Sequence, residues 1–87
     1  MKTKVALVMG GGAGTGRATA LAFVDEGASV VVADVNEEGG RETLAQVQAK
    51  GGDGFFVRAD MSDAGDVENA VAHALEVFGG LHMVSNN

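Results

Sequence analysis

The sequence predicts an α/β fold in which a doubly wound parallel sheet lies between two layers of helices. Short apolar runs alternate along the chain with longer segments of helical periodicity. Every connection between consecutive strands is long enough to hold a helix, as neighbouring parallel strands require. The 14 glycines fall mainly where one element ends and the next begins, and the chain has no proline. These observations favour a three-layer β-α-β-α-β-α-β arrangement.

Seven elements are expected, beginning with a strand and alternating with helices, at residues 4–9, 14–26, 29–34, 37–50, 54–59, 63–78 and 81–85. The first run is apolar throughout, which is typical of a strand covered on both faces. Asn36 and Ser62 are placed to cap the second and third helices, and Gly27 and Gly79 to end the first and third. The helix positions expected to face the sheet are Ala18, Leu21 and Ala22, then Gly40, Leu44 and Val47, then Val67, Val71, Ala74, Leu75 and Phe78.

The composition limits the class of protein. A chain of 87 residues allows one small domain, and no apolar run approaches the roughly 18 residues of a membrane span. The net charge of −6 argues against nucleic acid or an anionic membrane as the main partner, since both attract basic surfaces. The absence of cysteine excludes thiolate metal sites, and His73 and His82 have no metal-ligand partners at useful spacing. We expect a cytoplasmic protein without a metal site.

A glycine-rich loop connects the first strand to the first helix. Five glycines occupy the seven positions from Gly10 to Gly16. Without Cβ atoms, such a loop brings backbone N–H groups and a helix N-terminus close to a phosphate. The sequence therefore predicts a site for a nucleotide pyrophosphate; the alternative is a structural turn that only allows close packing of helix and strand.

An acidic residue follows the second strand. Asp34 lies 18 residues after Gly16, close to the spacing expected for the carboxylate that binds the ribose hydroxyls of NAD. A carboxylate there repels a 2′-phosphate, and Val35 and Asn36 supply no cation that would attract one. Arg17 is the nearest candidate for a phosphate contact, although a solvated charge on the helix is the favoured interpretation. NAD is expected rather than NADP; the alternative role for Asp34 is a turn or cap residue.

The motif spacing resembles that of a known family. The pattern Gly10-x-x-x-Gly14-x-Gly16 is similar to the glycine motif of the short-chain dehydrogenase/reductase family. Residues 58–62 resemble the family's segment after the third strand, and residues 78–87 resemble the approach to its Asn-Asn-Ala-Gly motif. The sequence departs from the family's usual Thr, Ile, Asp and apolar residue at Met9, Thr15, His82 and Ser85, respectively.

The resemblance implies a Rossmann-type sheet with strand order 3-2-1-4. It also implies that the Asp60 side chain reaches the adenine amino group and that the Met61 backbone contacts the ring. The alternatives without a role in binding are a cap or turn carboxylate for Asp60 and a polar chain end for Asn86 and Asn87. The residues that match cofactor-binding positions are Gly10, Gly11, Gly12, Gly14, Thr15, Gly16, Asp34, Asp60, Met61 and Asn87.

The family's catalytic set of Ser, Tyr and Lys follows the fourth strand, and this chain contains no tyrosine. No catalytic residue is therefore assigned. We expect residues 1–87 to be the incomplete, N-terminal dinucleotide-binding half of a Rossmann-fold domain, inactive by itself. The resemblance implies that the full-length enzyme transfers hydride between NAD(H) and an alcohol or carbonyl substrate and forms a homo-oligomer.

Two other functions are compatible with the sequence. The chain would be a non-catalytic nucleotide-binding module if it were complete at 87 residues. An S-adenosylmethionine-dependent methyltransferase fragment would also carry a glycine loop and an acid after the second strand. That loop usually has an acid just before closely spaced glycines, where this sequence has Val8 and Met9.

Overall fold

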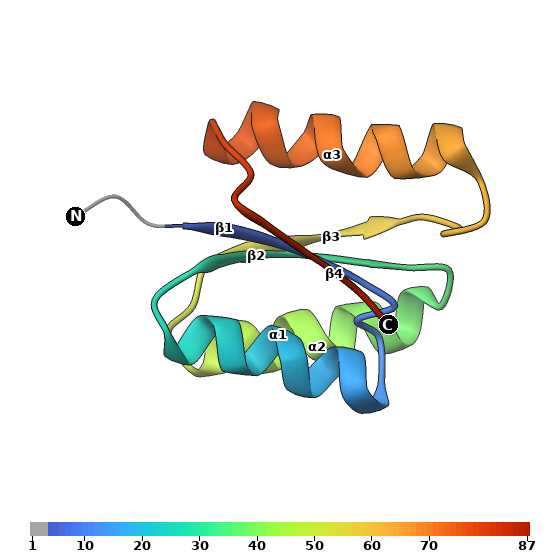
Figure 1. Cartoon of the computed structure of the whole chain (residues 1–87). Helices are drawn as coiled ribbons and strands as arrows, with labels where there is room; N and C mark the ends of the chain where they lie inside the picture. The colour runs from blue at the N-terminus through green and yellow to red at the C-terminus, as the bar shows by residue number, and fades with distance from the viewer. Residues whose placement is uncertain (1–3) are drawn as a thin grey trace.

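The computed structural model describes residues 4–87, which form a four-stranded parallel sheet with helices on both faces (Figure 1). The strands are β1 (Val5–Met9), β2 (Ser29–Asp34), β3 (Gly54–Arg58) and β4 (Met83–Asn86). The helices are α1 (Gly14–Asp25), α2 (Glu37–Ala49) and α3 (Ala64–Phe78). The predicted alternation of strands and helices is confirmed, with differences of one or two residues at the ends of elements.

The strand order is β3-β2-β1-β4, as predicted, and all neighbouring strands are parallel. In the centre of the sheet Leu7 pairs with Val31 on one side and with Val84 on the other. The chain moves outward from β1 to β3 and then returns to place β4 on the opposite side of β1. This reversal leaves a crevice at the carboxyl ends of the strands, where ligands bind in open α/β sheets.

The helices cover the two faces of the sheet unequally. Helix α3 lies on one face, and α1 and α2 lie together on the other (Figure 1). All five residues of β1 are buried, as expected for a strand covered on both sides. The core on the α3 face consists of Val5, Leu7, Met9, Val31, Ala33, Val57, Ala59, Ala70 and Ala74, and that on the other face of Val8, Ala20, Val30 and Val32.

The prediction of which residues of α1 face the sheet is wrong. Ala18 and Ala22 are exposed, Leu21 is half-buried, and Gly16 and Ala20 are buried instead. A Cβ at position 16 would collide with the carbonyl oxygen of Gly10, so α1 touches the loop through this glycine. That contact fixes the rotation of the helix, and Ala20, four positions later on the same face, is therefore turned toward the sheet.

The other two helices differ from prediction in part. On α3, Leu75 is 49% exposed, whereas the small Ala70 and Ala74 are buried against the sheet. On α2, Thr43 is fully buried and Leu44 only half-buried. Short side chains let these helices approach the sheet closely, and the larger neighbouring residues then fall at the edge of the contact.

The capping prediction is confirmed for α2 and wrong for α3. The Asn36 side chain accepts a hydrogen bond from the backbone N–H of Gly39 at 3.0 Å. Helix α3 is capped by Asp63, which accepts from the N–H groups of Gly65 and Asp66, and not by Ser62. A carboxylate at this end also interacts favourably with the helix dipole. Within residues 4–87 no helix combines the length and apolarity needed to cross a membrane.

Candidate functional site

The β1–α1 loop wraps tightly around the carboxyl end of β1. Gly10 has a φ of 76°, a conformation that side chains disfavour, and a Cβ there would lie 2.6 Å from the carbonyl oxygen of Asn87. The N–H groups of Gly10 and Gly11 both donate to the carbonyl of Ala33 in β2, at 2.8 and 3.3 Å. These contacts place the loop directly above the strand ends.

The N-terminus of α1 differs from those of α2 and α3 because no side chain caps it. Its N-cap residue, Ala13, has no acceptor side chain, and its first turn contains no acidic residue. The N–H groups of Gly14, Thr15 and Gly16 belong to the first turn, where an α-helix supplies no acceptors. Ala13, Gly14 and Thr15 are exposed. This end of α1 therefore presents backbone donors and the positive end of the helix dipole to an anion.

Asp34 lies at the end of β2 and binds the loop. Its Oδ2 accepts a hydrogen bond from the backbone N–H of Gly12 at 2.9 Å, and its Oδ1 accepts one from the N–H of Asn36 at 3.0 Å. The carboxylate is partly exposed and borders a cavity. Asp34 thus makes hydrogen bonds within the turn into α2 and also faces the space beside the loop.

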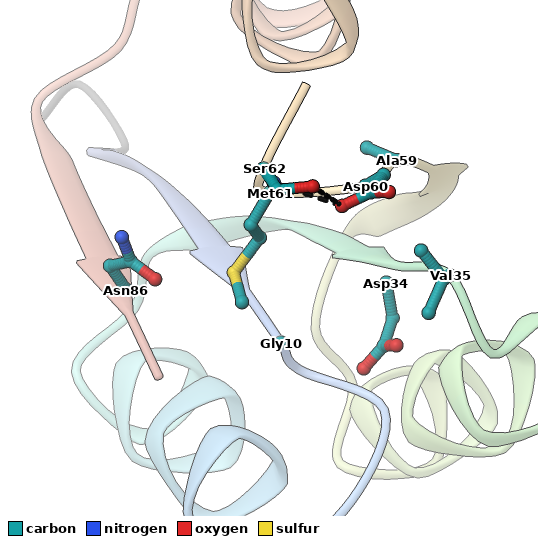
Figure 2. A pocket seen from close by; sticks show the side chains of 8 residues that line it. All are labelled: Gly10, Asp34, Val35, Ala59, Asp60, Met61, Ser62 and Asn86. Carbon is teal, nitrogen blue, oxygen red and sulfur yellow. Dashed lines mark hydrogen bonds between the residues drawn. The ribbon is translucent and has the colours of Figure 1, made fainter. Parts of the chain in front are cut away.

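The cavity lies at the carboxyl ends of the strands and has a volume of about 470 Å³. Ligand pockets commonly have volumes of about 300–1,000 Å³. Two of its apolar side chains, Val35 and Met61, are 51% and 40% exposed. Figure 2 shows Met61 extending from the β3–α3 connection in the direction of Gly10. The lining residues are Gly10, Asp34, Val35, Ala59, Asp60, Met61, Ser62 and Asn86.

Asp60 adds a second carboxylate to the cavity wall. Its Oδ1 accepts hydrogen bonds from the Ser62 hydroxyl at 2.7 Å and from the Ser62 N–H at 2.9 Å (Figure 2). These bonds, assisted by the charge of Arg58, hold the pKa of Asp60 below its ordinary value. The group is therefore an ionised acceptor at neutral pH.

The predicted site residues fall into two groups. Gly10, Asp34, Asp60 and Met61 line the cavity. The other predicted residues do not line it: Gly11, Gly12, Gly14, Thr15 and Gly16 form the loop and the first turn of α1, and Asn87 follows β4.

Asn87 lies beside the loop and joins β4 to β1. Its N–H donates to the carbonyl of Met9 at 3.0 Å, and its Nδ2 donates to the hydroxyl of Ser85 at 3.0 Å. The neighbouring Asn86 lines the cavity. Four lining residues were absent from the predicted set: Val35, Ala59, Ser62 and Asn86. Their position within two residues of a strand end or next to a predicted site residue is the sequence signal that identifies them.

Residues 4–87 contain no group of three or more His, Cys, Asp or Glu side chains arranged to hold a metal ion. The groups that the structure places at the site are backbone donors, two carboxylates, the side chains of Ser62 and Asn86, and apolar walls.

The fold, the glycine loop and the cavity define the Rossmann-type class of α/β proteins. A sequence model described as short chain dehydrogenase matches residues 4–87, and the chain belongs to this family of oxidoreductases. The 2,5-dichloro-2,5-cyclohexadiene-1,4-diol dehydrogenase of Sphingobium indicum is 49% identical over 83 residues, which cover 95% of this chain and 33% of that protein. The chain spans about a third of the length of the curated relatives it matches.

Solved structures agree with this assignment. A short chain dehydrogenase/reductase from Burkholderia phymatum, solved in complex with NAD, matches with a TM-score of 0.91 and 36% identity over 95% of this chain and 30% of that one. Actinorhodin polyketide ketoreductase, solved with NADPH, matches with a TM-score of 0.93 and 31% identity over 100% of this chain and 34% of that one. Neither a methyltransferase nor a non-catalytic module is favoured by these relatives.

Proposed function

We propose that this protein is an NAD(H)-dependent oxidoreductase acting on an alcohol or carbonyl substrate, and that residues 1–87 form its N-terminal dinucleotide-binding half. The observation that carries the proposal is the uncapped N-terminus of α1 beside a cavity bordered by Asp34. A dinucleotide needs donors for its pyrophosphate and acceptors for its ribose hydroxyls, and these two features supply both.

Different residues of the site would bind different parts of the cofactor. The N–H groups at the start of α1, from Ala13 to Gly16, would face the pyrophosphate. Gly10, Gly11 and Gly12, whose own N–H groups bind Ala33 and Asp34, would shape the loop that approaches it. Asp34 would accept from the adenosine ribose. The carboxylate of Asp60 and the backbone and side chain of Met61 would hold the adenine, with Asn87 supporting the loop from β4. The nicotinamide would exchange hydride with the substrate. The catalytic residues would lie outside these 87 residues, so the chain by itself would be inactive.

NAD is favoured over NADP on electrostatic grounds. The Asp34 carboxylate would repel a 2′-phosphate at the ribose it binds. Arg17 does not relieve that repulsion, because its guanidinium binds the carbonyls of Gly12 and Gly39 and the side chains of Glu42 and Thr43. Solved relatives hold either cofactor, so the preference depends on these local charges.

We place the full-length protein in the cytoplasm, as a homo-oligomer that acts on a small molecule. A net charge of −6 over this chain disfavours nucleic acid and anionic membranes as partners.

Calorimetric titration of the complete gene product with NADH, NADPH and S-adenosylmethionine tests the proposal. We expect NADH to bind about tenfold or more tightly than NADPH, which corresponds to the loss of roughly one charge-assisted contact. S-adenosylmethionine should not bind. A protein that binds none of the nicotinamide cofactors, or that prefers S-adenosylmethionine, would overturn the proposed function.

A further inference from the structure

Arg17 connects the glycine loop to helix α2. Its Nη2 donates to the carbonyl of Gly12 at 2.7 Å and to the carbonyl of Gly39 at 3.3 Å. Its Nε donates to the hydroxyl of Thr43 at 2.9 Å, and its Nη1 pairs with the exposed Glu42 at 3.1 Å. The side chain is 24% exposed. The guanidinium therefore binds groups of the protein itself. A residue that binds a phosphate, or a charge solvated at the surface, would not be bonded in this way.

Thr43 continues this connection into the buried side of the loop. Thr43 is fully buried. Its hydroxyl donates to the carbonyl of Gly11 at 2.8 Å and accepts a hydrogen bond from Arg17. Together the two side chains bind two consecutive carbonyl groups of the loop, those of Gly11 and Gly12. Their sequence separation of 26 residues shows that α2 supports the loop from outside the motif.

The rigidity of the peptide group passes this restraint on to the neighbouring donors. The peptide bonds of residues 4–87 are trans, so each C=O points opposite to the N–H of the following residue. The peptide unit between Gly11 and Gly12 is held at both ends, by Thr43 on its oxygen and by Asp34 on its nitrogen. In the next unit, Arg17 holds the Gly12 oxygen, which turns the N–H of exposed Ala13 away from α2.

We propose that Arg17 and Thr43 are positioning residues that hold the glycine loop with its backbone donors turned toward a pyrophosphate. The inference rests on the proposed function, because it concerns how that ligand is bound. Neither side chain contacts the pyrophosphate; both act through the Gly11 and Gly12 carbonyls. Loss of either restraint frees the peptide units of the loop to rotate, and the Ala13 donor then no longer has a fixed direction.

Binding of NADH and of adenosine to the complete gene product separates this role from a structural one. Adenosine contains the adenine and ribose but no phosphate, so its affinity does not depend on the loop donors. We expect Thr43→Val and Arg17→Leu to weaken NADH binding about tenfold each, while adenosine affinity changes less than about twofold. Calorimetry measures the NADH affinity, and NMR chemical shifts measure the weaker adenosine binding.

Three control variants make the comparison specific. Thr43→Ser keeps the hydroxyl and should bind NADH like the unsubstituted protein. Arg17→Lys keeps the charge but loses the planar fork that reaches the Thr43 hydroxyl and the Gly12 carbonyl together, so it should remain weakened. Arg41→Leu removes an exposed cation from α2, the helix that carries Thr43. Arg41 pairs with Glu37 rather than with the loop, so this variant should leave NADH affinity within about twofold.

The outcomes distinguish failure of the proposed function from failure of the positioning role of Arg17 and Thr43. If the unsubstituted protein binds no NADH, the proposed function fails and this inference falls with it. If that protein binds NADH and the Thr43→Val and Arg17→Leu variants bind it equally well, the positioning role alone is wrong. Equal losses for NADH and adenosine would show general damage to the fold, and full recovery by Arg17→Lys would show that charge alone matters; either result overturns the inference.

Discussion

Asp34 and Gly12 are joined by a hydrogen bond of 2.9 Å from the Gly12 N–H to the Asp34 Oδ2. A Cβ at position 12 would lie 2.7 Å from that oxygen, so glycine allows the approach. The second oxygen of the carboxylate accepts from the N–H of Asn36, which begins the turn into α2. One side chain thus joins the glycine loop, the end of β2 and the cavity wall. A change at Asp34 should alter both the loop and the ligand preference.

Asp34→Asn should weaken NADH binding and reduce discrimination against NADPH. An amide has one acceptor oxygen, so it cannot serve both backbone donors, and its neutral side chain does not repel a 2′-phosphate. We expect NADH affinity to fall about tenfold and the ratio of the NADPH and NADH dissociation constants to fall by at least as much. Calorimetric titration with both cofactors measures the ratio. Asp53→Asn, the same charge change at the other end of the sheet, should leave it unaltered. An unchanged ratio in Asp34→Asn would contradict the assigned role.

Ser62→Ala should raise the pKa of Asp60 toward its ordinary value. The Ser62 hydroxyl is the largest cause of the lowered pKa, and the Ser62 backbone N–H, which remains in the variant, is the second. Because the folded-state pKa is lowered, the interaction stabilises the fold above the ordinary carboxyl pKa. That stabilisation is lost as pH falls through the lowered value. An NMR titration of the Asp60 carboxyl carbon measures the shift. Ser85→Ala is the control, and an identical Asp60 titration in both variants would show that the hydroxyl bond has no effect.

The order of the elements could be predicted from sequence because its signals are local and strong. The apolar runs of β1 and β2 and the glycines between elements mark the boundaries without knowledge of contacts. The rotation of the helices could be predicted only in part. Gly40, Val47 and Ala74 are buried as predicted, but the pattern does not indicate the buried Ala20 and Ala70, because alanine contributes little to an apolar pattern dominated by leucine and valine.

Some residues of the site could also be predicted from sequence, and others could not. Asp34 could be found because it ends β2 at the expected spacing from the glycine loop, and Asp60 and Met61 because their segment resembles that of a known family. The roles of Arg17 and Thr43 could not, because their hydrogen bond joins residues 26 positions apart. It forms only because α2 packs beside the loop, and that packing depends on the close approach of Gly39 to the Gly12 carbonyl. Contacts of this kind have no periodic signature in the sequence.

Gly40→Ala should destabilise the protein although the position is helical. Alanine in place of an exposed helical glycine is favourable by about 1 kcal/mol. Here the Phe56 ring occupies the space that a Cβ would need, so the ring or the helix has to move. We expect the free energy of unfolding to fall by about 1–3 kcal/mol, measured by urea denaturation. Phe56→Leu removes the ring, so the double variant should show a favourable coupling of about 1 kcal/mol or more. A stabilising Gly40→Ala substitution would refute the steric argument.

His82→Phe should destabilise the start of β1, because His82 and Val5 exchange two hydrogen bonds. The His82 N–H donates to the Val5 carbonyl at 2.9 Å, and the buried Val5 N–H donates to the His82 Nδ1 at 3.0 Å. Phenylalanine keeps the first bond and leaves the Val5 donor without an acceptor, which costs about 1–3 kcal/mol of unfolding free energy. His82→Asp and His82→Asn each restore an acceptor, and Asp is the residue that short-chain dehydrogenases usually carry here. Both should retain more stability in urea denaturation than His82→Phe does. Equal losses in all three variants would contradict the hydrogen-bond argument, since restoring an acceptor would then have made no difference.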